Sequence, residues 1–379
     1  MSSEFREFQV FVKPVGARCN LACSYCYYLE KQGIGSSSPG GVMREDILGR
    51  YIRQHLEAST EPEIFFSWHG GEPLLAGLDF YRKAVELQKK YRPAGTTVMN
   101  GIQTNATLIT EEWGRFLSRE GFYAGISLDG PEKYHNLNRT RRDGTGTFAD
   151  VMRGLDVIRK HSVPHEFLCV VSNDNVHAPL ELYRFFRGLG AAYITFLPVV
   201  EKSPGADGNT SPRTVRPLDF GKFLAAVFDE WIGNDIGSMK VQIFEEALRT
   251  AFRQEHTLCI FKPVCGGVPV VEMNGDFYSC DHYVTPGHMI GNINDTTLAA
   301  LLDDPRQKAF GQAKRNKLPH YCLECEVLDM CNGECPKNRF ITAPTGEQGL
   351  NYLCEGYRYF FNHCRPFVSE VARLWGDEG

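Results

Sequence analysis

This sequence of 379 residues lacks several features that would assign a protein to a class at once. No apolar run approaches the roughly 18 residues that a membrane-spanning helix needs. Met1–Glu7 is polar and charged, without the apolar segment of a signal peptide. The net charge of −5 argues against binding nucleic acid through bulk positive charge. We therefore expect a cytoplasmic protein whose partners are neither membranes nor nucleic acids.

Cysteine is the residue that stands out, because the chain has 13 of them and most are clustered. A chain of this length can bury a large core, so it needs no disulfides to fold. In a cytoplasmic protein, clustered cysteines more often bind metal or take part in chemistry than form disulfides. The clusters therefore indicate metal sites.

The chain up to about Val200 alternates between two patterns. Runs rich in β-forming residues predict strands at Phe8–Val12, Glu63–Trp68, Thr96–Gln103, Tyr123–Leu128, Glu166–Val171 and Tyr193–Leu197. Helical periodicity predicts helices at Met43–Ala58, Glu111–Glu120, Pro179–Leu189 and, after a loop at Glu201–Pro217, Leu218–Trp231. This alternation predicts an α/β fold with parallel strands, in an open doubly wound sheet or a closed barrel-like one. In both, the site lies at the C-terminal ends of the strands.

The first cysteine group follows the first predicted strand directly. Cys19, Cys23 and Cys26 form a C-x3-C-x2-C run. Three thiolates on one short loop can hold three corners of a [4Fe–4S] cluster and leave the fourth iron open to a substrate. The spacing alone also allows a structural zinc site with a fourth ligand from elsewhere.

This run, with Tyr25 before its last cysteine, resembles that of the radical S-adenosylmethionine (SAM) enzymes. The resemblance implies a partial (β/α)6 TIM-like barrel and a SAM molecule bound at the open iron, with Tyr25 beside it. When the reduced cluster cleaves SAM, a 5′-deoxyadenosyl radical forms and takes a hydrogen atom from the substrate.

Segments at later strand ends extend the resemblance. His69–Pro73 is similar to the Gly-Gly-Glu motif of the family, which implies that Gly71 and Glu72 hold the SAM amino group. The family pattern further implies that Ser127 contacts the ribose or carboxylate region of SAM, Arg139 its carboxylate and Val200 its adenine. By themselves, the glycines would indicate a turn before a helix, and Arg139 a solvated surface arginine.

Eight more cysteines lie between Cys259 and Cys354, among turn residues. Their pattern resembles the SPASM extension of radical SAM enzymes that modify peptides, although a pair of zinc ribbons is the alternative from spacing. The resemblance implies two auxiliary [4Fe–4S] clusters, one held by Cys259, Cys265, Cys280 and Cys335, the other by Cys322, Cys325, Cys331 and Cys354. Three clusters are thus expected, with a radical SAM core at residues 1–235 and a SPASM domain at residues 236–379. The remaining Cys169 and Cys364 are expected to be bystanders.

Four runs narrow the resemblance to the anaerobic sulfatase-maturating enzymes: Cys19–Tyr28, His69–Pro73, Ser127–Arg139 and Cys280–Tyr283. Those enzymes oxidise a Cys or Ser of an unfolded sulfatase polypeptide to Cα-formylglycine without oxygen. The resemblance implies that Asp281 is the catalytic base and that Tyr28 and His69 lie beside the substrate. It also implies a small electron donor such as flavodoxin or ferredoxin.

Alternatives remain at this stage. Asp281 could be a turn residue, and His69 stands where some of these enzymes carry Gln, so it could simply pack under the turn. The preference for Cys or Ser stays open for the same reason. A SPASM enzyme acting on another ribosomally made peptide is the closest rival function, and a zinc-bound interaction module is the rival from a different class.

Overall fold

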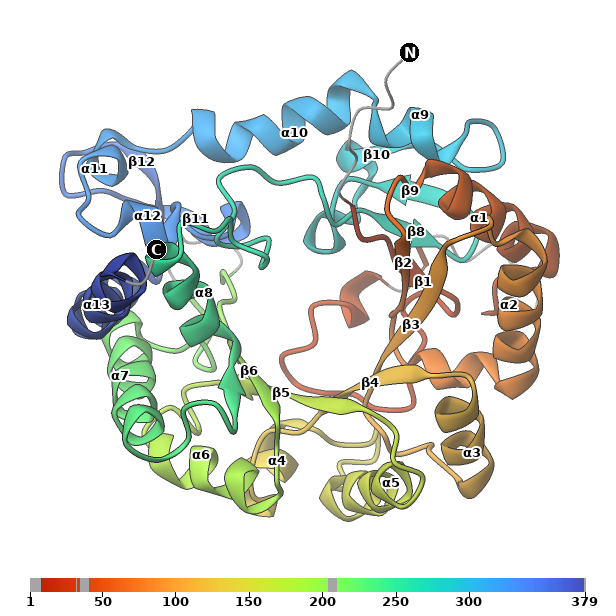
Figure 1. The fold of residues 1–379 in the computed structure, drawn as a ribbon, viewed down its shortest axis with the longest axis horizontal. Coiled ribbons are helices and arrows are strands. Elements are labelled where there is room, and N and C mark those ends of the chain that lie inside the picture. Colours follow the sequence, from red (N-terminus) through yellow and green to blue (C-terminus); the bar gives the residue numbers. More distant parts are fainter. Residues whose placement is uncertain (1–7, 32, 35–40, 204–209, 378–379) are drawn as a thin grey trace. The chain divides into compact units, whose positions relative to one another are not determined.

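The computed structural model describes residues 8–31, 33–34, 41–203 and 210–377 (Figure 1). These residues form two compact units built from interleaved segments. The first unit draws on the described residues of Met1–Ser127, Asn138–His165 and Gly266–Gly311, and the second on those of Leu128–Leu137, Glu166–Cys265 and Gln312–Gly379. In the described part of the chain, no helix has both the length and the hydropathy needed to cross a bilayer.

In the first unit, four parallel strands follow one another in space as they do in sequence. They are β1 (Phe11–Lys13), β2 (Glu63–Trp68), β3 (Thr97–Thr104) and β4 (Phe122–Ser127). The helices of this part are α1 (Glu45–Ala58), α2 (Leu78–Tyr91), α3 (Glu111–Arg119) and α5 (Phe148–Lys160), with short 3-10 turns η1 (Leu29–Lys31) and η3 (Pro73–Ala76). Figure 1 shows α1 and α2 on one side of β1–β3.

Burial explains why these segments form the predicted elements. The apolar face expected for the first helix is buried along α1, at Ile47, Leu48, Tyr51, Ile52 and Leu56. Trp68, at the end of β2, is fully buried, and its Nε1 donates a hydrogen bond to Asn100 Oδ1 at 2.9 Å. The polar atom of this large side chain is therefore satisfied inside the core.

Three strands from the cysteine-rich part of the sequence, consecutive ones antiparallel, extend the same sheet. They are β8 (Val270–Glu272), β9 (Asp276–Tyr278) and β10 (Met289–Asn292), followed by α9 (Leu298–Leu302). Strand β8 runs parallel to β1, and their register places Lys13 opposite Glu272. The 3-10 turns η4 (Asp281–Tyr283) and η5 (Pro286–His288) lie between β9 and β10. Strands β8 and β9 have three residues each and lie among turn residues, so the sequence did not predict them.

In the second unit, β5 (His165–Val171), β6 (Tyr193–Pro198) and β7 (Lys240–Val241) are parallel neighbours. Its helices include α4 (Glu132–Asn138), α6 (Pro179–Gly188), α7 (Pro217–Asn234), α8 (Gln242–Ala251), α11 (His320–Leu323), α12 (Leu328–Cys331) and α13 (Cys354–Asp377). The hairpin β11 (Arg339–Thr342) and β12 (Gln348–Asn351) follows the 3-10 turn η6 (Pro336–Asn338), and α10 (Pro305–Asn316) contributes residues to both units.

The parallel strands and crossover helices confirm the expected α/β class. Strand order rises one step at a time from β1 to β4 and from β5 to β7, without the reversal that defines a doubly wound sheet. Part of the predicted loop Glu201–Pro217, residues 204–209, lies outside the described residues.

Candidate active site

The first cysteine group lies on the loop between β1 and η1. This loop carries three of the predicted cluster ligands, Cys19, Cys23 and Cys26, which form no disulfide and are half-buried. Two main-chain hydrogen bonds fasten it: Ala22 N–H donates to the Thr140 carbonyl (2.8 Å), and Ser24 N–H to the Asn138 carbonyl (3.0 Å). The loop is therefore held next to the segment that carries Arg139.

The surroundings of Cys19 fit a metal-bound sulfur. Its Sγ accepts a hydrogen bond from the Leu21 N–H (3.4 Å) and a weaker one from Asn105 Nδ2 (3.8 Å). Burial raises the pKa of the Cys19 thiol to about 12, so the thiolate is disfavoured when no cation is present. Coordination to a metal supplies that cation and deprotonates the thiol.

Among the described residues, no group of three or more His, Cys, Asp or Glu side chains lies close enough together to hold a single metal ion.

The Gly-Gly segment after β2 packs directly against the cysteine loop. Gly71 N–H donates to the Gly16 carbonyl (2.8 Å), and a Cβ at Gly71 would lie 2.1 Å from the Arg18 carbonyl oxygen. Gly70 has φ +133°, a conformation that L side chains rarely adopt. Only glycine permits this approach, and the contact of this segment with SAM stays a prediction.

Gly71→Ala is therefore expected to disturb this contact. The added Cβ forces backbone atoms apart, so we expect a loss of about 1–3 kcal/mol in the free energy of unfolding, together with weaker SAM binding. Denaturant titration and equilibrium dialysis measure the two effects. The control is Gly49→Ala in α1, where the nearest atom to the new Cβ is Leu87 Cδ1 at 3.9 Å. Equal SAM affinity of the Gly71 variant and the wild type would contradict the close-approach argument.

Glu72 is fully buried, and its carboxylate is held by protein donors. It accepts hydrogen bonds from the Leu74 N–H (3.0 Å), the Thr104 hydroxyl (2.8 Å) and the Asn105 N–H (2.8 Å). Burial raises the pKa of Glu72 to about 7, against these hydrogen bonds. Glu72 thus ties the end of β2 to the end of β3, and its contact with SAM stays a prediction.

The other predicted SAM contacts lie at strand ends or beside the cysteine loop. At the end of β4, Ser127 Oγ accepts a hydrogen bond from Gln103 Nε2 (3.0 Å). The Arg139 guanidinium lies 5.5 Å from the centre of the Tyr25 ring. Val200 belongs to the second unit, where it is buried after β6 and its carbonyl accepts a hydrogen bond from Lys337 Nζ (3.3 Å).

Asp281 sits in a buried charged group in the first unit. Its Oδ1 pairs with Lys13 Nζ at 2.6 Å, its Oδ2 accepts a hydrogen bond from the Tyr27 hydroxyl, and its main-chain carbonyl accepts one from Lys31 Nζ (2.7 Å). Burial opposes ionisation of Asp281, but the positive charge of Lys13 outweighs it and holds the pKa of Asp281 well below its usual range. The carboxylate is therefore ionised at neutral pH, as a group that accepts a proton must be, although the pairing with Lys13 lowers its basicity.

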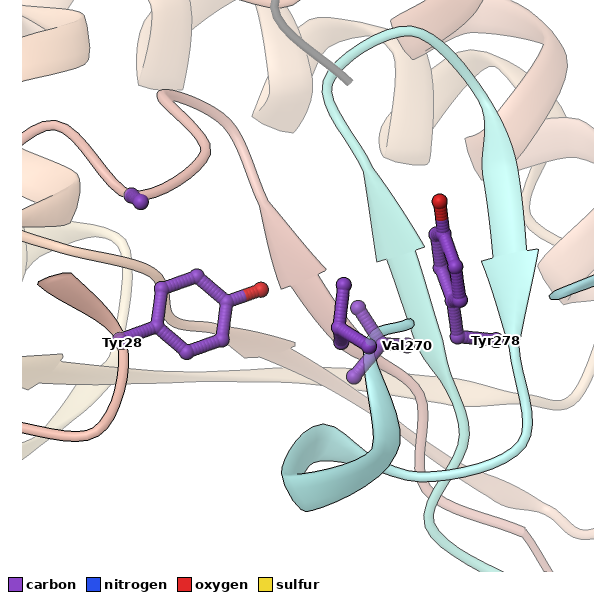
Figure 2. Packing of buried hydrophobic residues seen from close by; sticks show 5 residues of the cluster. Tyr28, Val270 and Tyr278 are labelled. Carbon is purple, nitrogen blue, oxygen red and sulfur yellow. The ribbon is translucent and has the colours of Figure 1, made fainter. Parts of the chain in front are cut away.

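Tyr28 belongs to the same part of the molecule. Its ring packs with Val270 and Tyr278, and Figure 2 shows its hydroxyl directed toward the strands. The hydroxyl donates to Glu272 Oε1, and Lys13 Nζ lies 4.4 Å from the centre of the ring. Tyr28 is thus fixed between the cysteine loop and β8.

His69 is a neutral imidazole. Burial lowers its pKa to about 3, and its Nε2 lies 2.9 Å from the Ser67 hydroxyl. The ring stacks on Phe11 with centres 3.8 Å apart. These contacts fix the orientation of the ring, and its contact with a substrate stays a prediction.

Glu272 gives the first unit a pH-dependent stability. Burial raises the pKa of its carboxyl from 4.5 to about 7, so ionisation of Glu272 costs stability. Its contribution is complete below about pH 4.5 and is lost as the pH rises through about 7. We expect the free energy of unfolding to fall over that range.

Glu272→Gln should make this fall shallower, without abolishing it, because Glu72 contributes in the same direction. Denaturant titrations at several pH values measure the slope. The control is Glu57→Gln, at a side chain that is 65% exposed. Identical slopes for wild type and Glu272→Gln would contradict the assignment.

In the second unit, four predicted ligands of one auxiliary cluster line a single cavity. They are Cys322, Cys325, Cys331 and Cys354. Tyr321 and Arg358 lie at the same cavity. Burial raises the pKa of Cys354 to about 12. A closed set of four thiols fits a fully ligated cluster, because thiolates are its ligands.

Three predicted ligands of the other auxiliary cluster, Cys259, Cys265 and Cys335, also belong to the second unit. The structure places the fourth, Cys280, in the first unit, after β9. Burial raises the pKa of Cys259 to about 11, so this thiol is protonated at neutral pH when no cation is bound. Cys169, in β5, and Cys364, in α13, are buried, as expected for bystanders.

Comparison with known proteins decides the family. The radical SAM superfamily matches residues 14–186, and the iron–sulfur cluster-binding domain called SPASM matches residues 265–326. The serine-type anaerobic sulfatase-maturating enzyme of Bacteroides thetaiotaomicron is 42% identical over 377 residues, covering 96% of this chain and 91% of that enzyme. The chain belongs to the anaerobic sulfatase-maturating enzymes.

Other relatives support the same family assignment. The cysteine-type enzyme of Clostridium perfringens is 32% identical over 365 residues, covering 96% of this chain and 98% of that enzyme. The solved structure of native anSMEcpe with bound AdoMet and Cp18Cys peptide has a TM-score of 0.87 and 31% identity, covering 97% of this chain and 99% of that one. The expected fold class is thereby confirmed, and the chain is a radical SAM enzyme of iron–sulfur type, not a zinc-bound interaction module.

The sequence alone missed several residues that surround the predicted site residues Asp281 and Tyr28. Lys13, Tyr27, Lys31 and Glu272 surround Asp281 and Tyr28. One signal was present: Lys13 directly follows the apolar run Val10–Val12 of the predicted strand Phe8–Val12. A lysine there must find a partner, because a buried ammonium is costly unless it is paired.

Proposed function

We propose that this chain oxidises the active-site Cys or Ser of a sulfatase polypeptide to Cα-formylglycine without oxygen. The observation that carries the proposal is the ionised, buried carboxylate of Asp281, held by Lys13 and Tyr27 in a chain that aligns with sulfatase-maturating enzymes over nearly its whole length. The relatives include both serine-type and cysteine-type enzymes. Both target residues are therefore candidates.

The oxidation removes one hydrogen atom, one proton and one electron from the target side chain. When bound, SAM and the iron–sulfur clusters supply the 5′-deoxyadenosyl radical that takes the Cβ hydrogen atom and the acceptor for the electron. Asp281 accepts the proton of the thiol or hydroxyl group. The product is an aldehyde from Ser, or a thioaldehyde from Cys that water converts to the aldehyde with release of hydrogen sulfide.

The other residues bind and orient. Cys19, Cys23 and Cys26 would hold the cluster that binds SAM. Gly71 and Glu72 would hold the SAM amino group, and Arg139 would pair with its carboxylate, as a guanidinium fork suits. The proposal also includes contacts of Tyr25 and Ser127 with SAM, of Val200 with its adenine, and of Tyr28 and His69 with the target side chain.

The proposal includes three [4Fe–4S] clusters, a small electron donor of the flavodoxin or ferredoxin class, and a division into a core at residues 1–235 and a SPASM domain at residues 236–379. Air-free protein should then bind about twelve iron and twelve sulfide per chain. The cytoplasmic location also stays a prediction.

Mass spectrometry of sulfatase-motif peptides tests the proposal. The air-free enzyme is incubated with SAM, a reductant and matched peptides that carry Cys or Ser at the target position. We expect loss of two hydrogens from the Ser peptide, and exchange of the thiol for an aldehyde in the Cys peptide. A third peptide with Ala at the target position is the control. Formation of 5′-deoxyadenosine without either aldehyde would overturn the proposed substrate.

A further inference from the structure

A buried lysine lies among the predicted ligands of an auxiliary cluster. Lys314, on α10, is 1% exposed, and its Nζ donates to the main-chain carbonyls of Cys259 (2.9 Å) and Ile260 (2.7 Å). Burial lowers the pKa of Lys314, and the nearby thiols of Cys265, Cys259 and Cys335 oppose this shift. The ammonium group is therefore bound to the main chain of one predicted cluster ligand and lies near the thiols of three.

A second cationic side chain binds the turn between Cys331 and Cys335. Arg339, at the start of β11, donates to the carbonyls of Asn332 (3.0 Å), Gly333 (2.8 Å) and Glu334 (3.1 Å). It also donates to the Lys314 carbonyl at 2.5 Å. One guanidinium thus binds four main-chain carbonyls.

The loop itself has an unusual conformation. Asn332, Gly333 and Glu334 have φ values of +48°, +68° and +49°, so three consecutive residues are left-handed. Such residues cost about 1–2 kcal/mol each unless they are glycine. A Cβ at Gly333 would lie 2.7 Å from Arg339 Nη2, so the turn closes tightly around the guanidinium. The turn connects Cys331 to Cys335, which are predicted ligands of different clusters.

These contacts form one continuous connection. Arg339 binds the Cys331–Cys335 turn and the main chain of Lys314, and the side chain of Lys314 binds the main chain at Cys259. Arginine keeps its charge at all relevant pH values. The opposing charge nearby is Glu334, whose carboxylate accepts hydrogen bonds from Asn338 and Asn351. Positive charge and hydrogen bonds around an iron–sulfur cluster raise its reduction potential.

We propose that Lys314 and Arg339 are positioning residues for the auxiliary clusters. These two side chains hold Cys259 and the Cys331–Cys335 turn in place, and they favour uptake of the substrate's electron by an auxiliary cluster. The inference rests on the proposed function only for the source of that electron. Each aldehyde formed releases one electron, and one-electron reduction of an auxiliary cluster balances it. The target side chain is thus the electron donor, and the auxiliary cluster is the acceptor.

The test compares Lys314→Met with the wild-type holoenzyme. We expect full iron content and a more negative midpoint potential for an auxiliary cluster, in a redox titration followed by electron paramagnetic resonance. Loss of one buried charge should weaken one-electron uptake about tenfold or more, which corresponds to a shift of about 59 mV. The matched control is Lys317→Met, at an exposed lysine on the segment that follows α10. Its potential should equal that of the wild type.

Each outcome decides the proposal. An unchanged potential in a fully loaded Lys314→Met variant would overturn it. If Lys314→Met and Lys314→Gln both fail to load the auxiliary clusters while Lys314→Arg loads them, the positive charge is required, as proposed. If Lys314→Arg also fails, the site depends on the shape of lysine and the proposal is wrong.

The same measurements separate this inference from the proposed function. Wild-type enzyme that makes 5′-deoxyadenosine but no aldehyde disproves the substrate, while the comparison of potentials still stands. With an active wild type, Lys314→Met should give less formylglycine per 5′-deoxyadenosine, because electron removal is slowed after radical formation. Lys317→Met should keep the wild-type ratio.

Discussion

Replacement of Asp281 by Asn is expected to lower formylglycine formation by about 10²–10⁴-fold, the usual contribution of a general base. The amide keeps the size of the side chain but cannot accept the proton of the target thiol or hydroxyl. Formation of 5′-deoxyadenosine should continue, because the residues proposed to bind SAM are unchanged. Peptide mass spectrometry and chromatography of the nucleoside measure the two products in one reaction.

The setting of Asp281 sharpens this expectation. Lys13 Nζ pairs with it at 2.6 Å and Tyr27 donates to it, so an amide at this position leaves a buried ammonium without its anion. Iron content must therefore be measured as well, since Cys280 is the adjacent residue. Asp295→Asn, at an exposed aspartate beyond β10, is the matched control. Wild-type aldehyde formation by a fully loaded Asp281→Asn variant would show that another group is the base.

Local patterns were enough to predict much of the fold. The predicted strand Glu63–Trp68 has the bounds of β2, and the apolar face of the first predicted helix is buried in α1. These elements have strong periodicity or a run of β-forming residues, so the local sequence determines their secondary structure. The cysteine motifs could also be recognised in the sequence, because predicted ligands on one loop keep a fixed spacing.

Contacts between distant residues could not be predicted. Tyr27 and Asp281 are 254 positions apart, and Tyr28 and Glu272 are 244 apart. These residues meet because β8 pairs with β1. No local sequence pattern predicted β8, which has only three residues. The resemblance predicts that Glu72 contacts SAM, and this stays a prediction. The three protein donors to its carboxylate, from Leu74, Thr104 and Asn105, could not be predicted from the sequence.

The Cys19→Ala variant is expected to lose SAM cleavage altogether while keeping its auxiliary clusters. Two cysteines cannot hold a cluster that needs three protein ligands and one open iron. Iron should fall from about twelve to about eight per chain, because the eight auxiliary cysteines are unchanged. Iron analysis and the yield of 5′-deoxyadenosine under strong reduction measure the two effects.

The matched control is Cys169→Ala, which removes a buried thiol that lies in β5 and belongs to neither cysteine group. It should keep all the iron and the full yield of 5′-deoxyadenosine, at a modest cost in stability from the lost sulfur. Burial raises the pKa of the Cys19 thiol to about 12, so this thiol is protonated at neutral pH when no cation is bound. Continued 5′-deoxyadenosine formation by Cys19→Ala would place the SAM-binding iron elsewhere in the chain.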